Sequence, residues 1–134
     1  MAVILFIHQE AAQQGEALHT KMTQYFGANT IEAVHTITAL TYILKQPAGC
    51  DQKVYVLLAE SRHRLQELYC LFTLLDGRRI VLVLPDDTKA TISLSHQFYP
   101  RFFTYSNTAY DDLCAVLYKM MNHTQTHSSK EGKK

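Results

Sequence analysis

The sequence predicts an α/β domain in which helices cover both faces of a five-stranded parallel sheet. Three runs, at residues 3–7, 54–58 and 80–84, are almost wholly apolar, which is typical of strands buried on both faces. Segments with helical spacing of apolar residues separate the runs, and strict alternation of strand and helix favours parallel pairing. A chain of 134 residues can hold one complete core.

The first two helices are predicted from apolar stripes and from the residues at their ends. The first stripe consists of Ala11, Gly15, Leu18, Met22 and Tyr25 or Phe26. Gly27 follows it, and glycine is common at the position directly after a helix. Thr36 is a good N-cap for a second helix, which carries on one face Ile37, Leu40 and Ile43 or Leu44. Pro47 and Gly49 then open a loop.

Three further helices follow from the same signals. Ser61 caps a helix that Gly77 closes, with an apolar stripe of Leu65, Leu68 or Tyr69, Phe72 and Leu75. Residues 88–97 show a weak helical pattern, with Thr88 as the N-cap. In this helix, Ile92 and Leu94 are expected to face the core. Thr108 and Asp111 form a variant of the capping box before a last helix with Leu113, Val116 or Leu117 and Met120.

Two less apolar segments, at residues 31–34 and 102–105, complete the set of strands. We place them at the edges of the sheet, because the three wholly apolar strands need cover on both faces. With right-handed crossovers, the predicted strand order is 2-1-3-4-5, which is the flavodoxin-like arrangement.

The charge balance excludes some classes of function. The chain has 13 Lys and Arg against 12 Asp and Glu, a net charge of +1, whereas nucleic-acid-binding domains carry a strong basic excess. Residues 123–134 contain three Lys and one Glu and no apolar side chain. We therefore expect a single domain over residues 1–122, a disordered tail over 123–134, and no nucleic-acid partner.

The cysteines and the apolar runs indicate the compartment. Cys50, Cys70 and Cys114 are odd in number and show no CxxC spacing, so we expect neither a disulfide framework nor a zinc site. Cys70 and Cys114 fall within helical patterns and are predicted to be small core residues. There is no signal peptide and no apolar run of membrane-spanning length. We expect a cytoplasmic protein without a membrane partner, complete from Met1, which opens directly into the first strand.

A ligand site is expected at the carboxyl edge of this sheet. Open parallel sheets bind ligands beyond the carboxyl ends of their strands, where the strand order reverses. Here that point lies between the first and third strands. The side chains delivered to this crevice are His8, Gln9, Glu10, Ala59, Glu60, Ser61, His63, Pro85, Asp86, Asp87 and Ser106.

The layout resembles the receiver domains of response regulators, the CheY-like family, over about residues 2–122. The resemblance rests on the order, lengths and hydrophobic pattern of the elements. It implies a CheY-like, three-layer form of the flavodoxin-like fold and a phosphorylation site in the crevice. In that family, acidic residues after the first strand hold magnesium, and an Asp at the end of the third strand accepts phosphate. A Ser or Thr follows the fourth strand and a Lys follows the fifth.

The matching positions of this chain carry other residues. After the first strand come His8-Gln9-Glu10, with at most one carboxylate, and the position of the acceptor Asp holds Ala59 or Leu58. Pro85 stands in place of the Ser or Thr, and Ser106 or Tyr105 stands in place of the Lys. Magnesium needs hard oxygen ligands, Ala59 has no oxygen to phosphorylate, and Pro85 has no hydroxyl. We therefore expect a degenerate pseudo-receiver that is not an enzyme, has no cofactor and acts in signalling through protein–protein contacts. Glu60 is interpreted either as a mimic of a phosphorylated Asp or as a solvated carboxylate favoured at a helix start.

A small-ligand-binding protein or enzyme of the flavodoxin-like type is the alternative. His8, Glu60, His63 and Asp86 lie near one sheet edge, and a His with carboxylates can perform acid–base chemistry. A phosphate cradle for a flavin or dinucleotide would need a Gly-rich or Ser/Thr-rich turn after the first strand. Gly15 is the one glycine in that region, so such cofactors are not expected.

Two surfaces are candidates for protein contacts. The face made by the helix at 88–97, the strand at 102–105 and the last helix is one through which receivers commonly pair, and it would serve for a homodimer. Its candidate interface residues are Tyr99, Arg101, Tyr105 and Tyr110, of types enriched in interfaces. The second is a basic group around the third helix, which is interpreted as a contact for an acidic partner or as a solvated helix end: Arg62, His63, Arg64, Arg78 and Arg79.

Overall fold

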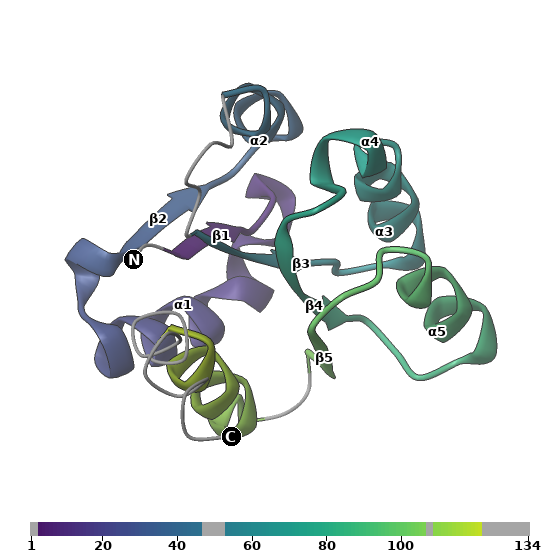
Figure 1. Cartoon of the computed structure of the whole chain (residues 1–134). Coiled ribbons are helices and arrows are strands. Elements are labelled where there is room, and N and C mark those ends of the chain that lie inside the picture. Colours follow the sequence, from purple (N-terminus) through teal and green to yellow (C-terminus); the bar gives the residue numbers. More distant parts are fainter. Residues whose placement is uncertain (1–2, 47–52, 107–108, 122–134) are drawn as a thin grey trace, which may run out of the picture.

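The computed structural model describes residues 3–46, 53–106 and 109–121, which contain a five-stranded, all-parallel sheet (Figure 1). The strand order is β2-β1-β3-β4-β5, as predicted. The strands are β1 (Val3–Phe6), β2 (Ile31–Val34), β3 (Val54–Leu58), β4 (Arg79–Leu84) and β5 (Phe102–Tyr105). The flavodoxin-like fold class is therefore confirmed.

Helices cover both faces of the sheet (Figure 1). They are α1 (Ala12–Phe26), α2 (Ile37–Leu44), α3 (Arg62–Tyr69), α4 (Phe72–Leu75), α5 (Lys89–His96) and a last helix at residues 111–121, with 3₁₀ turns η1 (Gln9–Ala11) and η2 (Ala28–Thr30). Helix α1 and the last helix form one core with Leu5, Val56 and Val81. Helices α2 to α5 cover the other face. Every residue of β1 and β3 is buried, whereas β2 and β5 are half-exposed edges, because only the central strands have helices on both sides and strands on both flanks.

The predicted N-caps form as expected within the described residues. The hydroxyl of Thr36 accepts from the N–H of Ala39 at 3.0 Å, and that of Ser61 accepts from Arg64 at 3.1 Å. Thr88 caps α5 in the same way. Each hydroxyl satisfies a backbone donor that the first turn of a helix leaves without a partner. Thr108, the predicted start of the capping box, lies outside the described residues, as do the tail at 123–134 and Cys50.

The single helix predicted from Ser61 to Gly77 is wrong, because it divides at Cys70 and Leu71. The N–H of Leu71 donates to the carbonyl of Leu68 at 2.9 Å, a three-residue spacing that ends α3 before α4 begins. Cys70 caps the end of α3 and is exposed, so its predicted place in the core is wrong. Cys114 is buried as predicted.

Helix α5 buries polar residues where Ile92 and Leu94 were expected. Thr91 and Ser95 have no exposed surface, whereas Ile92 and Leu94 are only partly buried. The hydroxyl of Ser95 donates to the carbonyl of Ile92 at 2.7 Å, and Thr91 contacts the hydroxyl of Thr88 at 3.1 Å. Local hydrogen bonds of this kind let small hydroxyl side chains lie on a buried face.

Close packing of α1 fixes the chain that leaves β1. Gly15 faces Ile7, and a Cβ at this glycine would lie 2.3 Å from the Cγ2 of Ile7. The missing side chain lets the helix approach the end of the strand, and so places residues 8–10 at the carboxyl edge. No helix among the described residues is long and apolar enough to cross a membrane.

Candidate functional site

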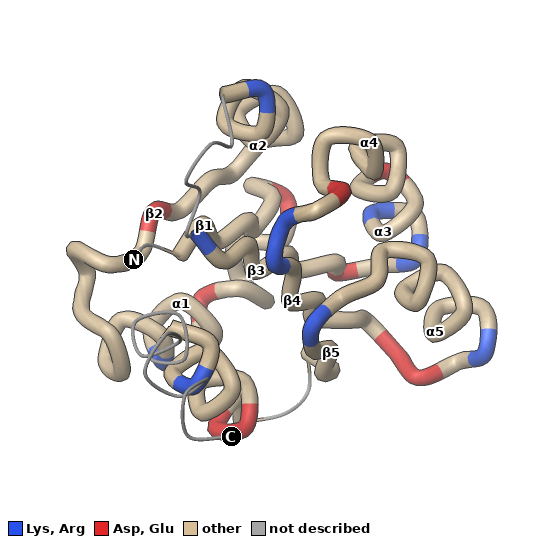
Figure 2. The backbone as a smooth tube through the Cα atoms, in the orientation of Figure 1, with Lys and Arg blue, Asp and Glu red and all other residues tan. Residues whose placement is uncertain are grey.

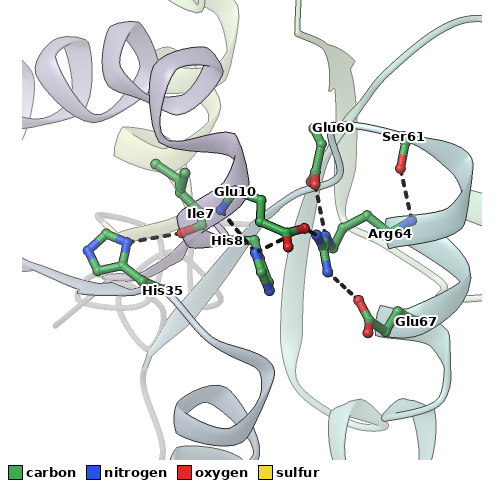
Figure 3. A network of polar contacts seen from close by, with 8 residues as sticks. All are labelled: Ile7, His8, Glu10, His35, Glu60, Ser61, Arg64 and Glu67. Carbon is green, nitrogen blue, oxygen red and sulfur yellow. Dashed lines mark hydrogen bonds and ion pairs between the residues drawn. The ribbon is translucent and has the colours of Figure 1, made fainter.

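The carboxyl ends of β1 and β3 meet at the predicted crevice. The two strands pair in parallel, with Phe6 beside Leu57, so the segments that follow them leave the sheet side by side. Figure 3 shows Glu10 from the first segment facing Arg64 from the second, with His8 beside Glu10 and Glu60 beside Arg64. The topology therefore brings together part of the predicted set, and adds Arg64 to it.

Ala59 continues the sheet instead of facing the crevice. Its side chain is 0% exposed and belongs to the core beneath α2 and α3. Its N–H donates to the carbonyl of Val83 at 2.9 Å, as in a further residue of β3. Ala59, which was expected to lie in the crevice, therefore presents a buried methyl group within the sheet.

The centre of the crevice is the guanidinium of Arg64, which three carboxylates surround (Figure 3). Its Nε donates to Glu60 Oε2 at 2.9 Å, its Nη2 donates to Glu10 Oε1 at 2.8 Å, and its Nη1 pairs with Glu67. The Arg64 side chain is only 8% exposed. We call these four residues the Arg64 network.

The electrostatics of the network keep Arg64 charged. Burial alone would lower the pKa of the guanidinium, but the hydrogen bonds and charges of Glu60, Glu67 and Glu10 together raise it. The planar fork of an arginine can serve several carboxylates at once. Glu60 and Glu67 lie four and three residues from Arg64 on the same chain segment, whereas Glu10 reaches it from the end of β1. The network therefore ties η1 to α3 across the crevice.

One of the two interpretations of Glu60 from the sequence, that of a solvated carboxylate, is wrong. Its side chain is only 14% exposed and pairs with Arg64, so it is not a solvated carboxylate. Its second oxygen, Oε1, is buried and has no hydrogen-bond partner. A buried acceptor without a partner is costly, and Oε1 is the one buried side-chain polar atom without a partner among the described residues.

Two histidines near the ends of β1 and β2 hold the main chain. The Nδ1 of His8 accepts from the N–H of Glu10 at 3.1 Å and so caps η1. The ring of His35, which follows β2, makes a 3.0 Å hydrogen bond from Nδ1 to the carbonyl of Ile7. Because a carbonyl only accepts, Nδ1 of His35 carries the proton in this contact. Each ring therefore has a main-chain partner.

The remaining crevice candidates lie apart from the network. Gln9, His63 and Asp87 are exposed, and Pro85 is half-buried. Asp86 accepts from the N–H of Thr88 at 3.1 Å and from its hydroxyl at 2.7 Å. Hydrogen bonds from Thr88, then Thr91, hold the pKa of Asp86 below its ordinary value. Asp86 thus serves the start of α5.

Ser106 belongs to the end of β5. Its N–H donates to Leu84 at 2.9 Å and its carbonyl accepts from the hydroxyl of Tyr110 at 2.8 Å. Tyr110 is therefore not an interface residue: it is 4% exposed and packs with Leu113 in the core under the last helix. Burial also raises the pKa of Tyr110.

The other interface candidates differ in exposure. Tyr99 is 78% exposed and has a positive φ of 53°, an unfavourable backbone conformation for a bulky residue. Arg101 is exposed, and Tyr105 is half-buried against Phe103. The ring of Tyr99 lies beside that of Phe72 in α4, with 6.4 Å between the ring centres. The exposed aromatic surface therefore extends toward α4 and not toward Tyr110.

Arg64 and Arg78 are the side chains whose direction the sequence did not predict. Both were grouped with a basic surface that either contacts an acidic partner or forms a solvated helix end, yet both donate hydrogen bonds to partners within the fold. The guanidinium of Arg78 donates to the Tyr55 hydroxyl and to the Leu44 carbonyl, each at 2.7 Å. The spacing of Glu60, Arg64 and Glu67 by four and three residues was the available signal, but Glu10 adds a contact 54 residues away.

No group of three or more His, Cys, Asp or Glu side chains suited to a metal ion occurs among the described residues. Comparison of the chain with protein-family models, with curated proteins and with solved structures gives no significant match. The proposals below therefore rest on the geometry of the chain alone.

Proposed function

We propose that the chain is a receiver-like signalling and interaction module that acts through protein–protein contacts without aspartyl phosphorylation. The observation that carries this proposal is the Arg64 network. In the crevice where a receiver would hold magnesium and phosphate, a buried guanidinium is bound by the carboxylates of Glu10, Glu60 and Glu67. These carboxylates are engaged with an internal cation, and the neighbouring Ala59 supplies no oxygen.

The contact surface in this proposal is the exposed end of α5 and β5. Tyr99 and Arg101 are exposed there, and both residue types are enriched at interface centres. The exposure of the Tyr99 ring, at 78%, leaves its apolar surface available for such a contact. A homodimer through α5, β5 and the last helix is one form that this contact can take.

Sedimentation velocity over a range of protein concentrations tests the proposal. We expect self-association that Tyr99→Ser weakens, and that Mg²⁺ with acetyl phosphate leaves unchanged. Tyr25→Ser is the matched control, because Tyr25 is also exposed, on α1. Association that appears only with the phosphate donor contradicts the proposal. A monomer at all concentrations removes the homodimer and leaves a different protein as the partner.

A small-ligand-binding protein is the second candidate, and the unpartnered Oε1 of Glu60 supports it. A ligand with a hydrogen-bond donor would satisfy that oxygen. Native mass spectrometry of the freshly purified chain distinguishes the two: a retained small molecule favours the ligand-binding protein, and the bare mass of the chain favours the interaction module.

A further inference from the structure

At the outer edge of β2, main-chain N–H and carbonyl groups face away from the sheet. Strand β2 pairs with β1 on one side and ends the sheet on the other (Figure 1). The carbonyl of Val34 accepts from Ile7 of the β1 segment at 3.0 Å. Because consecutive residues of a strand point their main-chain groups to opposite sides, the N–H and carbonyl of Ala33 face away from the sheet. Among the described contacts, none engages these two groups, and an edge of this kind is a template for a further strand.

A groove runs beside this edge. It has a volume of about 720 Å³ and lies between β2 and the first turns of α2. Its apolar lining includes Val34, Ala39 and Ile43, together with Tyr42, whose side chain is 70% exposed. An extended segment that pairs with β2 would place every second side chain into this groove, because side chains alternate along a strand. Main-chain pairing with a side-chain groove is the geometry of β-strand addition.

The carboxylate of Glu32 gives the groove a negative charge, which favours a basic occupant. Glu32, the acidic position of β2 (Figure 2), lines the groove and is exposed. It lies two residues from Val34 and therefore on the same face of the strand. An occupant with a Lys or Arg beside Glu32 and an apolar side chain beside Val34 matches both features. A second copy of β2 fits less well, since an antiparallel pair centred on Ala33 brings the two Glu32 side chains to diagonal positions on one face.

We propose that the outer edge of β2 binds an extended, basic segment of a partner protein as a sixth strand of the sheet. The partner strand pairs its main chain with Ala33, places a cationic side chain beside Glu32 and inserts an apolar side chain between Val34 and Ile43. This site lies at the opposite edge of the sheet from β5 and does not depend on the α5–β5 contact proposed above.

A designed peptide tests the site directly. The probe is N-acetylated, C-amidated Thr-Lys-Thr-Ile-Thr-Lys-Thr, whose symmetric pattern presents Lys and Ile to the groove in either strand direction. NMR titration of the full chain is expected to show saturable shifts of the β2 and α2 amides at peptide concentrations up to about 1 mM. The same peptide with Glu for Lys is expected to bind at least about fivefold more weakly.

Two substitutions separate pairing from folding. Ala33→Pro removes the outward N–H, and an edge strand tolerates proline where that N–H faces solvent. We expect it to weaken binding at least about fivefold, while Ala33→Val, which keeps the N–H, does not. Glu32→Lys is expected to reverse the preference between the Lys and Glu peptides. This reversal is independent of whether Ala33→Pro folds.

Three results would overturn the proposal. One is the absence of saturable shifts with the Lys peptide, and another is a set of shifts that maps away from β2 and α2. The third is self-association that Ala33→Pro abolishes, because the edge would then be occupied by a second copy of the chain and not by a foreign strand.

Discussion

The crevice above β1 and β3 and the outer edge of β2 belong to one sheet but treat their polar groups in opposite ways. In the crevice, a buried Arg64 and three glutamates bind one another, and two histidines bind the main chain. At the β2 edge, the main chain of Ala33 and the carboxylate of Glu32 face solvent beside a groove. Among the described residues, the crevice thus engages its charged groups internally and leaves one buried acceptor, Glu60 Oε1, without a partner, whereas the β2 edge presents main-chain groups and a carboxylate to solvent.

This contrast predicts that substitutions in the crevice cost stability and that substitutions at the β2 edge do not. Arg64→Ala gives the largest expected effect. It leaves Glu60 buried without its cation, beside two further carboxylates. Breaking a buried pair from one side costs up to about 5 kcal/mol, and the exposure of Glu10 and Glu67 reduces this to about 2–4 kcal/mol. Urea unfolding at neutral pH measures the loss.

Arg62→Ala is the matched control, because Arg62 is exposed on the same turn of α3. We expect it, and Ala33→Val at the open edge, to change the free energy of unfolding by less than about 0.5 kcal/mol. Equal losses for Arg62→Ala and Arg64→Ala would break the comparison between the two regions.

Gly15→Ala tests the packing that supports the crevice from below. The added methyl group would lie 2.3 Å from Ile7, and overpacking of this kind costs about 1–3 kcal/mol. The better helix propensity of alanine offsets up to about 1 kcal/mol of this cost. We therefore expect the free energy of unfolding, measured in urea, to fall by about 1–2 kcal/mol. Gln14→Ala, one residue away and exposed, should be neutral within about 0.5 kcal/mol. A neutral Gly15→Ala would show that α1 can move away from β1.

The smallest effect is a pH dependence at Asp86. Its pKa is lowered in the folded chain by hydrogen bonds from Thr88, so the carboxylate stabilises the fold at pH values above the unfolded value of about 3.9. That stability is lost as the pH falls below this value and through the folded pKa. Asp86→Asn should flatten the decline in unfolding free energy over this acid range, measured by urea titrations at a series of pH values. An unchanged slope would mean that Thr88 holds α5 without Asp86.

The strands and caps could be predicted from the sequence because their signals are local. The apolar runs at β1, β3 and β4 fix which strands are central, and Thr36 and Ser61 sit directly before the helices that they cap. The break at Cys70 has no comparable signal, because the apolar stripe continues across it. The direction of Arg64 depends on Glu10, which is distant in the chain, and the exposure of the β2 groove depends on where α2 lies. Such contacts appear only when the elements are assembled.

The most direct test is of the claim that the crevice holds an internal ion-pair network in place of a phosphorylation site. ¹⁵N-labelled full-length chain is titrated with Mg²⁺ and beryllofluoride, and a phosphorylatable receiver domain is run in the same buffer as a positive control. The proposal predicts that the amide signals of Ala59, Glu60 and Ser61 stay in place while those of the control shift. A saturable shift confined to these three residues would contradict it, because beryllofluoride would then have displaced Arg64 from its carboxylates.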